Sequence, residues 1–348
     1  MTNNYIPDSI APAWPASIAD GDVRAKLLEL LGVEEPTEVD FTIESEERKP
    51  DGATVSRLRF ANVLGDTVPG MLVQPSNAAD GSCTAGREPK GSASSEALSL
   101  ALPGVVCLPG TSGTAERMVH SHFHQQTPGR GPLIGWAREL ARRGFATLSL
   151  TLKGCEERRG ALEDWERTSK LLAPLGRPLM GVQVDEALRG IRVLAAHAGI
   201  DVGNIGLTGM SLGGNTTWYA MACAPWIRAA APVCGGVGSM DCAIRQGDAE
   251  RHSSYFYVPH LLRFFDHADI VRACILPRPF LAVAPRRDED MPSSGVDRLV
   301  QQVAPAYAAA GAGKNFEVRR PDMNHVFQPE YFEWVVEWFK KHLVGKGK

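Results

Sequence analysis

A serine between two glycines, in the run Gly209-Met210-Ser211-Leu212-Gly213, is the group of residues best suited to chemistry in this chain. A short apolar run, residues 205–208, precedes it, and a helical pattern follows. This G-x-S-x-G pattern between a strand and a helix is typical of a nucleophile elbow, a sharp turn that exposes the serine hydroxyl. The glycines remove side chains that would collide with the adjoining strand and helix. The pattern therefore predicts that Ser211 is a nucleophile for covalent acyl transfer.

A serine hydroxyl needs a general base, and the base needs a partner that orients it. In chains with this elbow the partners follow the serine in the order Asp or Glu, then His. His325 follows the last predicted strand, residues 316–319, and is the expected base. Asp288 follows the predicted strand 280–284 and is the expected acid, with Asp290 of the same acidic run as the alternative.

The negative oxygen that forms during acyl transfer needs backbone N–H donors. We expect the first donor to be the N–H of Leu212, because it directly follows the nucleophile. The second should come from the glycine-containing loop 109–113, which follows the predicted strand 104–108. The N–H of Thr111 is the preferred candidate there, and Gly110 is the next.

The substrate pocket is less clearly marked by the sequence. Gly110, Trp136 and Trp218 are the candidates for its lining, although a tryptophan is more often part of the core. Arg158 and Arg159 form either an exposed pair or a contact for an anionic group of the substrate.

Three histidines at alternating positions, His120, His122 and His124, lie in the loop after the first core strand. Such spacing can ligate zinc, but no carboxylate that would complete an open metal site accompanies them. We therefore expect these side chains to be solvated or to line the pocket. The sequence predicts neither a metal nor a cofactor.

The order of the predicted elements indicates an α/β fold with a mostly parallel central sheet and helices on both faces. Residues 38–47, 54–63 and 68–74 are expected to be strands that precede this pattern. Further strands are predicted at residues 104–108, 146–150, 205–208, 229–234, 280–284 and 316–319. Helices are predicted at residues 22–31, 133–143, 178–198, 258–265, 296–309 and 331–343.

The length of 348 residues is compatible with one large domain. We expect a single domain over residues 1–348, with an N-terminal extension over residues 1–53. Residues 75–98 and 111–132 are expected to be inserted loops near the site.

The composition argues against several classes of partner. The net charge of −3 shows no basic excess that would favour nucleic acid or an anionic membrane. No apolar run reaches the length of a membrane span, and the N-terminus lacks a signal-peptide pattern. Seven cysteines are scattered without C-x-x-C spacing, which fits reduced thiols better than a disulfide framework. A cytoplasmic location is therefore expected.

With these residues in place, the chain resembles the α/β-hydrolases, and among them the dienelactone hydrolase and acetyl xylan esterase-like branch. The resemblance covers about residues 100–345 and is carried by four segments. These are GVVCLPGTSGT, VDEALRGIRVLAAHAGIDVGNIGLTGMSLGG, YVPHLLRFFDHADIVRACILPRPFLAVAPRRDEDMP and MNHVFQPEYFEWVVEWFKKHL. It implies an α/β-hydrolase fold in which Ser211, Asp288 and His325 form a catalytic triad, with Leu212 and Thr111 as oxyanion donors.

The expected function is hydrolysis of a small carboxylic ester through an acyl-enzyme on Ser211, as in a carboxylesterase or an acetyl esterase. Three alternatives remain open. A peptidase can use the same fold and triad, and a dienelactone-type enzyme would use a cysteine nucleophile. A non-catalytic binding protein is the third, because a fold alone does not define a function.

Overall fold

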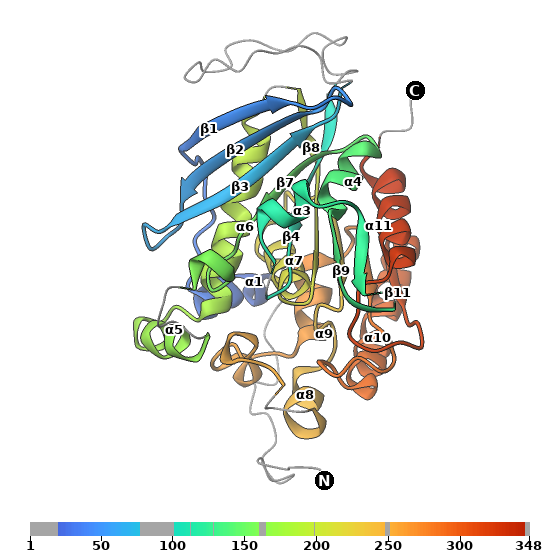
Figure 1. Ribbon diagram of the computed structural model, residues 1–348. Helices are drawn as coiled ribbons and strands as arrows, with labels where there is room; N and C mark the ends of the chain where they lie inside the picture. The colour runs from blue at the N-terminus through green and yellow to red at the C-terminus, as the bar shows by residue number, and fades with distance from the viewer. Residues whose placement is uncertain are drawn as a thin grey trace.

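The central feature of the computed structural model is a nine-stranded sheet, in the order β1-β2-β3-β7-β4-β8-β9-β10-β11 (Figure 1). The structure describes residues 20–76, 101–111, 113–127, 129–159, 165–197, 199–247 and 251–344. The strands are β1 (Phe41–Arg48), β2 (Thr54–Ala61), β3 (Thr67–Gln74), β4 (Leu102–Leu108), β7 (Ala146–Leu150), β8 (Ile200–Met210), β9 (Ala229–Val233), β10 (Phe280–Val283) and β11 (Phe316–Arg319).

The sheet has an antiparallel part and a parallel part. Strands β1, β2, β3 and β7 pair antiparallel in that order, whereas all neighbours from β7 to β11 are parallel. The sequence predicted both parts, because the first strands alternate polar and apolar residues whereas later ones are continuously apolar. In the register of β4 with β8, Leu108 lies opposite Gly209. The loop after β4 therefore begins beside the Ser211 turn.

Helices cover both faces of the sheet, and alternate residues of each strand contribute to two separate cores. Val106 and Leu108 of β4 pack in one core, whereas Val105 and Cys107 of the same strand pack in the other. The first core contains α1 (Asp20–Leu31), α6 (Leu179–Ala195), α7 (Leu212–Cys223) and α10 (Ser293–Ala309). The second contains α3 (Ala115–His120), α4 (Trp136–Arg142) and α11 (Pro329–His342). Shorter helices are α5 (Trp165–Leu172), α8 (Met240–Gln246) and α9 (His267–Ile270).

The prediction of a helix over residues 133–143 is wrong at its start. Leu133 and Ile134 end strand β6 (Arg130–Ile134), which pairs antiparallel with β5 (His124–Thr127) in a separate hairpin. Helix α4 begins only at Trp136, because Gly135 has a φ of 68°, a conformation that interrupts a right-handed helix.

The helix predicted over residues 258–265 is also wrong. The structure has a short 3-10 helix, Leu261–Arg263, at this place. The preceding residue, His260, has a φ of 65°, so a continuous α-helix through residue 260 is excluded.

Two segments, residues 75–98 and 111–132, were expected to be inserted loops. Residues 111–132 contain α3, β5 and part of β6, so this segment is more regular than a loop. Most of the segment 75–98 lies outside the described residues. Within the described ranges, no helix is long and apolar enough to cross a membrane.

Candidate active site

Ser211 occupies the sharp turn between strand β8 and helix α7. Its φ of 57° and ψ of −117° are rare for a residue with a side chain and cost free energy that the surrounding structure must offset. The turn is held on both sides: the Ser211 N–H donates to the Val233 carbonyl at 2.9 Å, and Asn215 N donates to the Ser211 carbonyl at 2.8 Å. The hydroxyl group consequently projects from the carboxyl end of the sheet, as the sequence pattern predicts.

Gly209 and Gly213 permit this turn because other backbone segments lie directly against them. A Cβ atom on Gly213 would lie 2.1 Å from the Leu108 carbonyl oxygen. A Cβ atom on Gly209 would lie 2.4 Å from the carbonyl carbon of Gly213. Since these neighbours are backbone atoms, no side-chain rotation can relieve either collision.

Replacing Gly213 with alanine is expected to reduce the free energy of unfolding by about 1–3 kcal/mol, the usual cost of overpacking a closed site. Gly203→Ala is the matched control, because the nearest non-neighbouring atom to its new Cβ would be Asp201 Oδ1 at 3.4 Å. Urea unfolding of both variants measures the difference. Equal stability of the two would show that the loop after β4 yields to the new methyl group.

His325 and Asp288 come from the loops after β11 and β10 and meet at the carboxyl end of the sheet. His325 Nδ1 lies 2.8 Å from Asp288 Oδ1, and the two side chains are 11% and 5% exposed. Arg286 and Arg287 donate backbone hydrogen bonds to Pro321 and Met323, which tie the two loops together. Burial lowers the pKa of His325, but the hydrogen bond to Asp288 and the charges of Asp288 and Asp290 outweigh burial, so its pKa is raised.

The other two acids of the run also contact His325. Glu289 Oε2 accepts a hydrogen bond from the His325 backbone N–H at 2.9 Å. Asp290 Oδ2 lies 3.2 Å from His325 Nε2, on the side of the ring opposite Asp288. Asp288 therefore occupies the place of an orienting acid at Nδ1, whereas Asp290 contacts the nitrogen that a nucleophile would need.

Leu212 and Thr111, the residues expected to supply the oxyanion donors, both lie near Ser211. Leu212 is the first residue of α7, and the first N–H groups of a helix have no partner within the helix. Thr111 follows Gly110 in the loop after β4 and lines the same cavity as Ser211. The helix start also favours negative charge beside Ser211.

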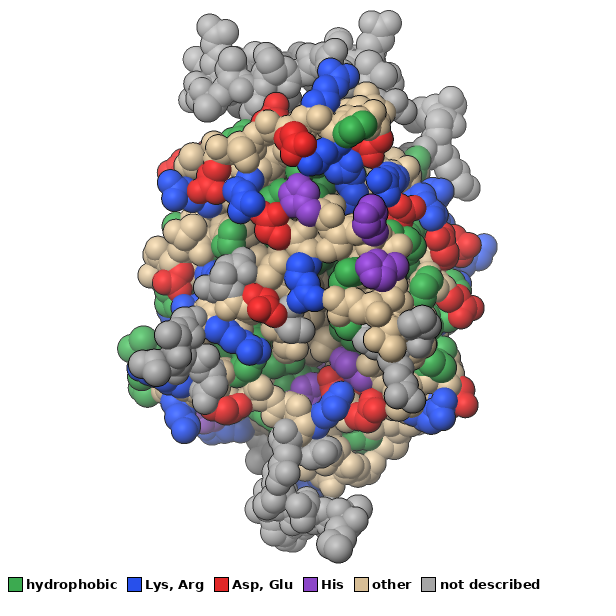
Figure 2. All heavy atoms as spheres, in the orientation of Figure 1, with side chains coloured by type: hydrophobic (Ala, Val, Ile, Leu, Met, Phe, Trp, Pro, Cys, Tyr) green, Lys and Arg blue, Asp and Glu red, His purple; other side chains and the backbone are tan. Residues whose placement is uncertain are grey.

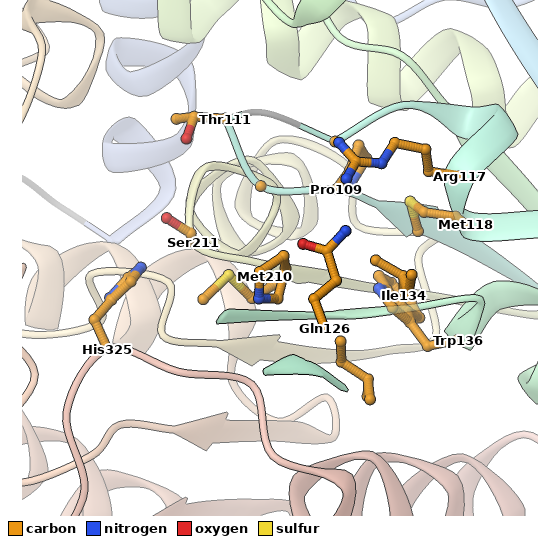
Figure 3. Close-up of a pocket in the computed structure, with 14 residues that line it drawn as sticks. Pro109, Thr111, Arg117, Met118, Gln126, Ile134, Trp136, Met210, Ser211 and His325 are labelled. Atoms are coloured by element: carbon orange, nitrogen blue, oxygen red, sulfur yellow. The ribbon is translucent and has the colours of Figure 1, made fainter. Parts of the chain in front are cut away.

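A cavity of about 310 Å³ opens beside Ser211, and Figure 3 shows His325 and Ser211 together at one side of it. Its lining consists of Pro109, Gly110, Thr111, Gly113, Arg117, Met118, Gln126, Pro132, Leu133, Ile134, Trp136, Met210, Ser211 and His325. The volume is at the lower end of the range for small-molecule sites. Gly110 and Trp136, which were candidates for the substrate pocket, are among these residues.

Trp218 does not line this cavity. Its indole is 1% exposed within the core, where Nε1 donates to the Gly235 carbonyl at 3.0 Å. The ring stacks on Tyr219 with centroids 3.9 Å apart. Helix α7 is buried all round, so a position about two helical turns beyond Ser211 faces the core and not the site.

The segment 113–134 contributes lining residues that the sequence did not single out, and Arg117 and Gln126 are the polar ones. Arg117 lies in α3, and Gln126 lies in the β5–β6 hairpin; both point into the cavity region in Figure 3. The hairpin is held over the site because Gln125 Nε2 donates to the Phe327 carbonyl at 3.4 Å. The neighbouring Phe123 ring also packs on Phe332 of α11 at 4.8 Å. The position of Gln126 depends on the pairing of β5 with β6, and no local pattern in the sequence predicted that pairing.

The prediction that Arg158 and Arg159 form an exposed pair or contact an anionic substrate group is wrong for Arg158. Its guanidinium Nη1 lies 2.8 Å from Glu186 Oε1, and the two side chains are 7% and 0% exposed. Neither arginine is among the residues that line the cavity. Among the described residues that line the cavity, the arginine is Arg117.

The three histidines of residues 120–124 are exposed and do not converge on one point. His120 Nε2 lies 3.3 Å from Glu116 Oε2, and His124 Nδ1 lies 2.9 Å from the His122 carbonyl oxygen. Figure 2 shows histidine side chains on the surface of the face that it views. Within the described residues, the one trio of His, Cys, Asp or Glu side chains whose ligand atoms lie within 4.8 Å of one another is Cys234, Asp288 and His325. That trio contains the His325–Asp288 pair itself.

Together, the strand order and the serine turn define the α/β-hydrolase fold, which confirms the fold class expected from the sequence. A protein of Bacillus subtilis (strain 168) named "Putative hydrolase YtaP" is 27% identical over 232 residues, which cover 63% of this chain and 76% of that protein. No protein-family model matches the chain.

Solved structures share the fold at low sequence identity. One from Bacteroides fragilis, described as a "putative acetyl xylan esterase", has a TM-score of 0.69 at 16% identity and covers 95% of this chain and 90% of its own. The glucuronoyl esterase from Solibacter usitatus has a TM-score of 0.63 at 14% identity and covers 97% of this chain and 98% of its own.

Proposed function

We propose that this protein is a serine hydrolase that cleaves carboxylic esters through an acyl-enzyme on Ser211. The observation that carries the proposal is the place of Ser211 in a strained strand-to-helix turn that lines a cavity together with His325. The Nδ1 atom of His325 lies 2.8 Å from Asp288. The structural neighbours described as esterases and the relative named as a hydrolase support the same reaction class.

In the proposed reaction, Ser211 Oγ attacks the ester carbonyl while His325 Nε2 takes the hydroxyl proton. Asp288 keeps the imidazole in the correct tautomer and stabilises its cation. The N–H groups of Leu212 and Thr111 donate to the oxyanion. His325 then gives the proton to the leaving alkoxide, and a water molecule activated by His325 hydrolyses the acyl-enzyme. No metal and no cofactor takes part in this scheme.

Labelling with a fluorophosphonate probe tests the proposal directly, because such probes phosphonylate an activated serine. We expect one equivalent to be incorporated at Ser211, and the peptide that carries the label identifies the site by mass spectrometry. A non-catalytic binding protein would remain unlabelled. Comparing amide with ester turnover separates the esterase from a peptidase of the same fold.

A cysteine nucleophile is the less supported alternative. All six described cysteines, at positions 107, 155, 223, 234, 242 and 274, are buried. None of them is among the residues that line the cavity. Burial also raises the pKa of the Cys234 thiol well above its usual range, so this thiol is held in its unreactive neutral form.

The substrate that fits the cavity is a small ester that carries an anionic group. The described residues that line the cavity are mainly apolar; Arg117 is the one arginine or lysine among them, and none of them is a carboxylate. Arg117 also lies 4.0 Å from Glu156, a long contact between two side chains that are 42% and 45% exposed. A guanidinium in a concave apolar site is suited to bind a carboxylate.

Replacing Arg117 with glutamine is expected to lower kcat/KM about tenfold for an ester with a terminal carboxylate, equivalent to about 1.4 kcal/mol. Turnover of the neutral ester of the same length should change much less. Mono-p-nitrophenyl glutarate and p-nitrophenyl valerate are a suitable pair. Arg272→Gln is the matched control, since this side chain is exposed and pairs with Asp269. An equal loss for both esters in the Arg117 variant would contradict the assignment.

We further propose that residues 1–348 form one domain and that the protein acts in the cytoplasm on a small-molecule ester, with no nucleic-acid or membrane partner. The continuous sheet from β1 to β11 supports a single domain over the described residues. The six described cysteines form no disulfide with one another, which supports a reducing compartment.

A further inference from the structure

Three consecutive acids surround His325, and Asp290 is the one whose role the ester hydrolysis described above leaves unexplained. Its Oδ2 atom lies 3.2 Å from His325 Nε2. Three hydrogen bonds hold Asp290 in place. Its Oδ1 accepts from Arg251 Nε at 2.7 Å, and its N–H donates to Asp288 Oδ1 at 2.9 Å. Its carbonyl oxygen lies 2.7 Å from His252 Nε2.

The contacts of the two ring nitrogens bear on how many protons the His325 ring carries. An ionised carboxylate only accepts hydrogen bonds, so a neutral ring would present a lone pair to one of the two carboxylates, whereas a ring protonated on both nitrogens attracts both. This arrangement and the raised pKa favour the imidazolium form of His325, which cannot take a proton from Ser211. Consistent with this state, no hydrogen bond joins Ser211 Oγ to His325, although the structure describes both residues.

We propose that Asp290 is a positioning residue that holds protonated His325 by Nε2 and releases it when the ring loses one proton. Loss of the Nε2 proton leaves a lone pair that faces the Asp290 carboxylate, so attraction becomes repulsion. The ring is then free to turn Nε2 toward Ser211, and Asp290 keeps its ion pair with Arg251. One deprotonation thus creates the base and breaks the contact that blocks it. This proposal rests on the proposed function.

The charged groups around His325 determine whether a substitution raises or lowers its pKa. The acids Asp288, Glu289 and Asp290 face it from the loop after β10, and Arg251 and His252 come from the segment after α8. The buried Cys234 thiol lies on the side of β9. Burial lowers the pKa of His252, so this neighbour remains neutral near pH 7 and adds no charge. Removing the Asp290 charge should therefore lower the pKa of His325, and removing the Arg251 charge should raise it.

The pH profile of kcat/KM is the first test, because it reports the pKa of the base in the free enzyme. With p-nitrophenyl acetate, Asp290→Asn is expected to move the acid limb down by about one pH unit, the usual shift from one nearby opposite charge. At a pH well below the wild-type limb this corresponds to about tenfold more activity. Asp322→Asn is the matched control, since that carboxylate is 76% exposed and pairs with Arg287.

A titration by nuclear magnetic resonance is the second test and does not depend on turnover. The His325 imidazole is followed in Ser211→Ala, in Ser211→Ala with Asp290→Asn, and in Ser211→Ala with Arg251→Gln. We expect the second protein to titrate about one pH unit lower than the first, and the third to titrate higher. Unchanged titration in both would overturn the proposal. Because these proteins lack the nucleophile and no turnover is measured, that result can be distinguished from a failure of the esterase assignment.

The rate of the Asp290→Asn variant above the acid limb, where the pH profile is flat, provides a third test. If Asp290 acts only through the protonated state of His325, Asp290→Asn keeps most of the wild-type rate above the acid limb. A loss of about 10³-fold or more at every pH, with the fold intact, would contradict this role. Such a loss would make Asp290 part of the reaction itself.

Discussion

Replacing Ser211 with alanine is expected to lower kcat for p-nitrophenyl acetate about 10⁶-fold and to abolish fluorophosphonate labelling. The Ser211 hydroxyl is the only protein group that bonds to the acyl carbon in the proposed scheme, so no neighbouring side chain replaces it. The residual rate would reflect the oxyanion donors and binding alone.

Ser45→Ala is a suitable control, because Ser45 is exposed on β1 and does not line the cavity. Circular dichroism and urea unfolding of the Ser211 variant test whether the fold is kept. We expect it to be kept, because alanine and serine have the same backbone conformational limits in this turn. Substantial turnover in a folded Ser211→Ala protein would refute the nucleophile assignment.

Replacing Asp288 with asparagine is expected to lower kcat about 10³–10⁴-fold. An amide at this place can donate to His325 Nδ1, which favours the wrong tautomer and removes the charge that stabilises the imidazolium. The 2.8 Å contact at Nδ1 and the low exposure of both side chains make the loss large. Initial rates with a saturating neutral ester measure it.

Asp290→Asn serves as the comparison within the same loop. If Asp288 orients the base, the loss in plateau rate belongs to the Asp288 variant and not to the Asp290 variant. The opposite result would assign the orienting role to Asp290, which the sequence kept as an alternative. Asp322→Asn controls for the general effect of removing a carboxylate nearby.

The sequence was most informative where backbone constraints leave few solutions. Gly209 and Gly213 flank Ser211 because other backbone atoms approach within 2.1–2.4 Å of where their side chains would lie. His325 and Asp288 were expected to lie close together because each comes soon after a predicted parallel strand, and the carboxyl ends of such strands meet at one edge. The same rule places the loop with Thr111.

The sequence was less informative about segments whose structure depends on distant contacts. The β5–β6 hairpin was missed because its residues alternate weakly and its position depends on Gln125 and Phe123 contacting the His325 loop and α11. Trp218 was misplaced because an aromatic residue near an elbow fits a pocket and a core equally well. Its burial follows from how α7 packs against its neighbours.

By itself, the sequence determined the chemical groups of this protein: a serine in a turn that requires glycine, and an acid and a histidine in the order that the fold brings together. Only the tertiary structure decided what surrounds those groups. Arg117 enters the cavity, and Asp288 and Asp290 contact opposite nitrogens of one ring. The physical reason is that backbone geometry is a local property of the chain, whereas the contacts of a side chain depend on segments far away in the sequence.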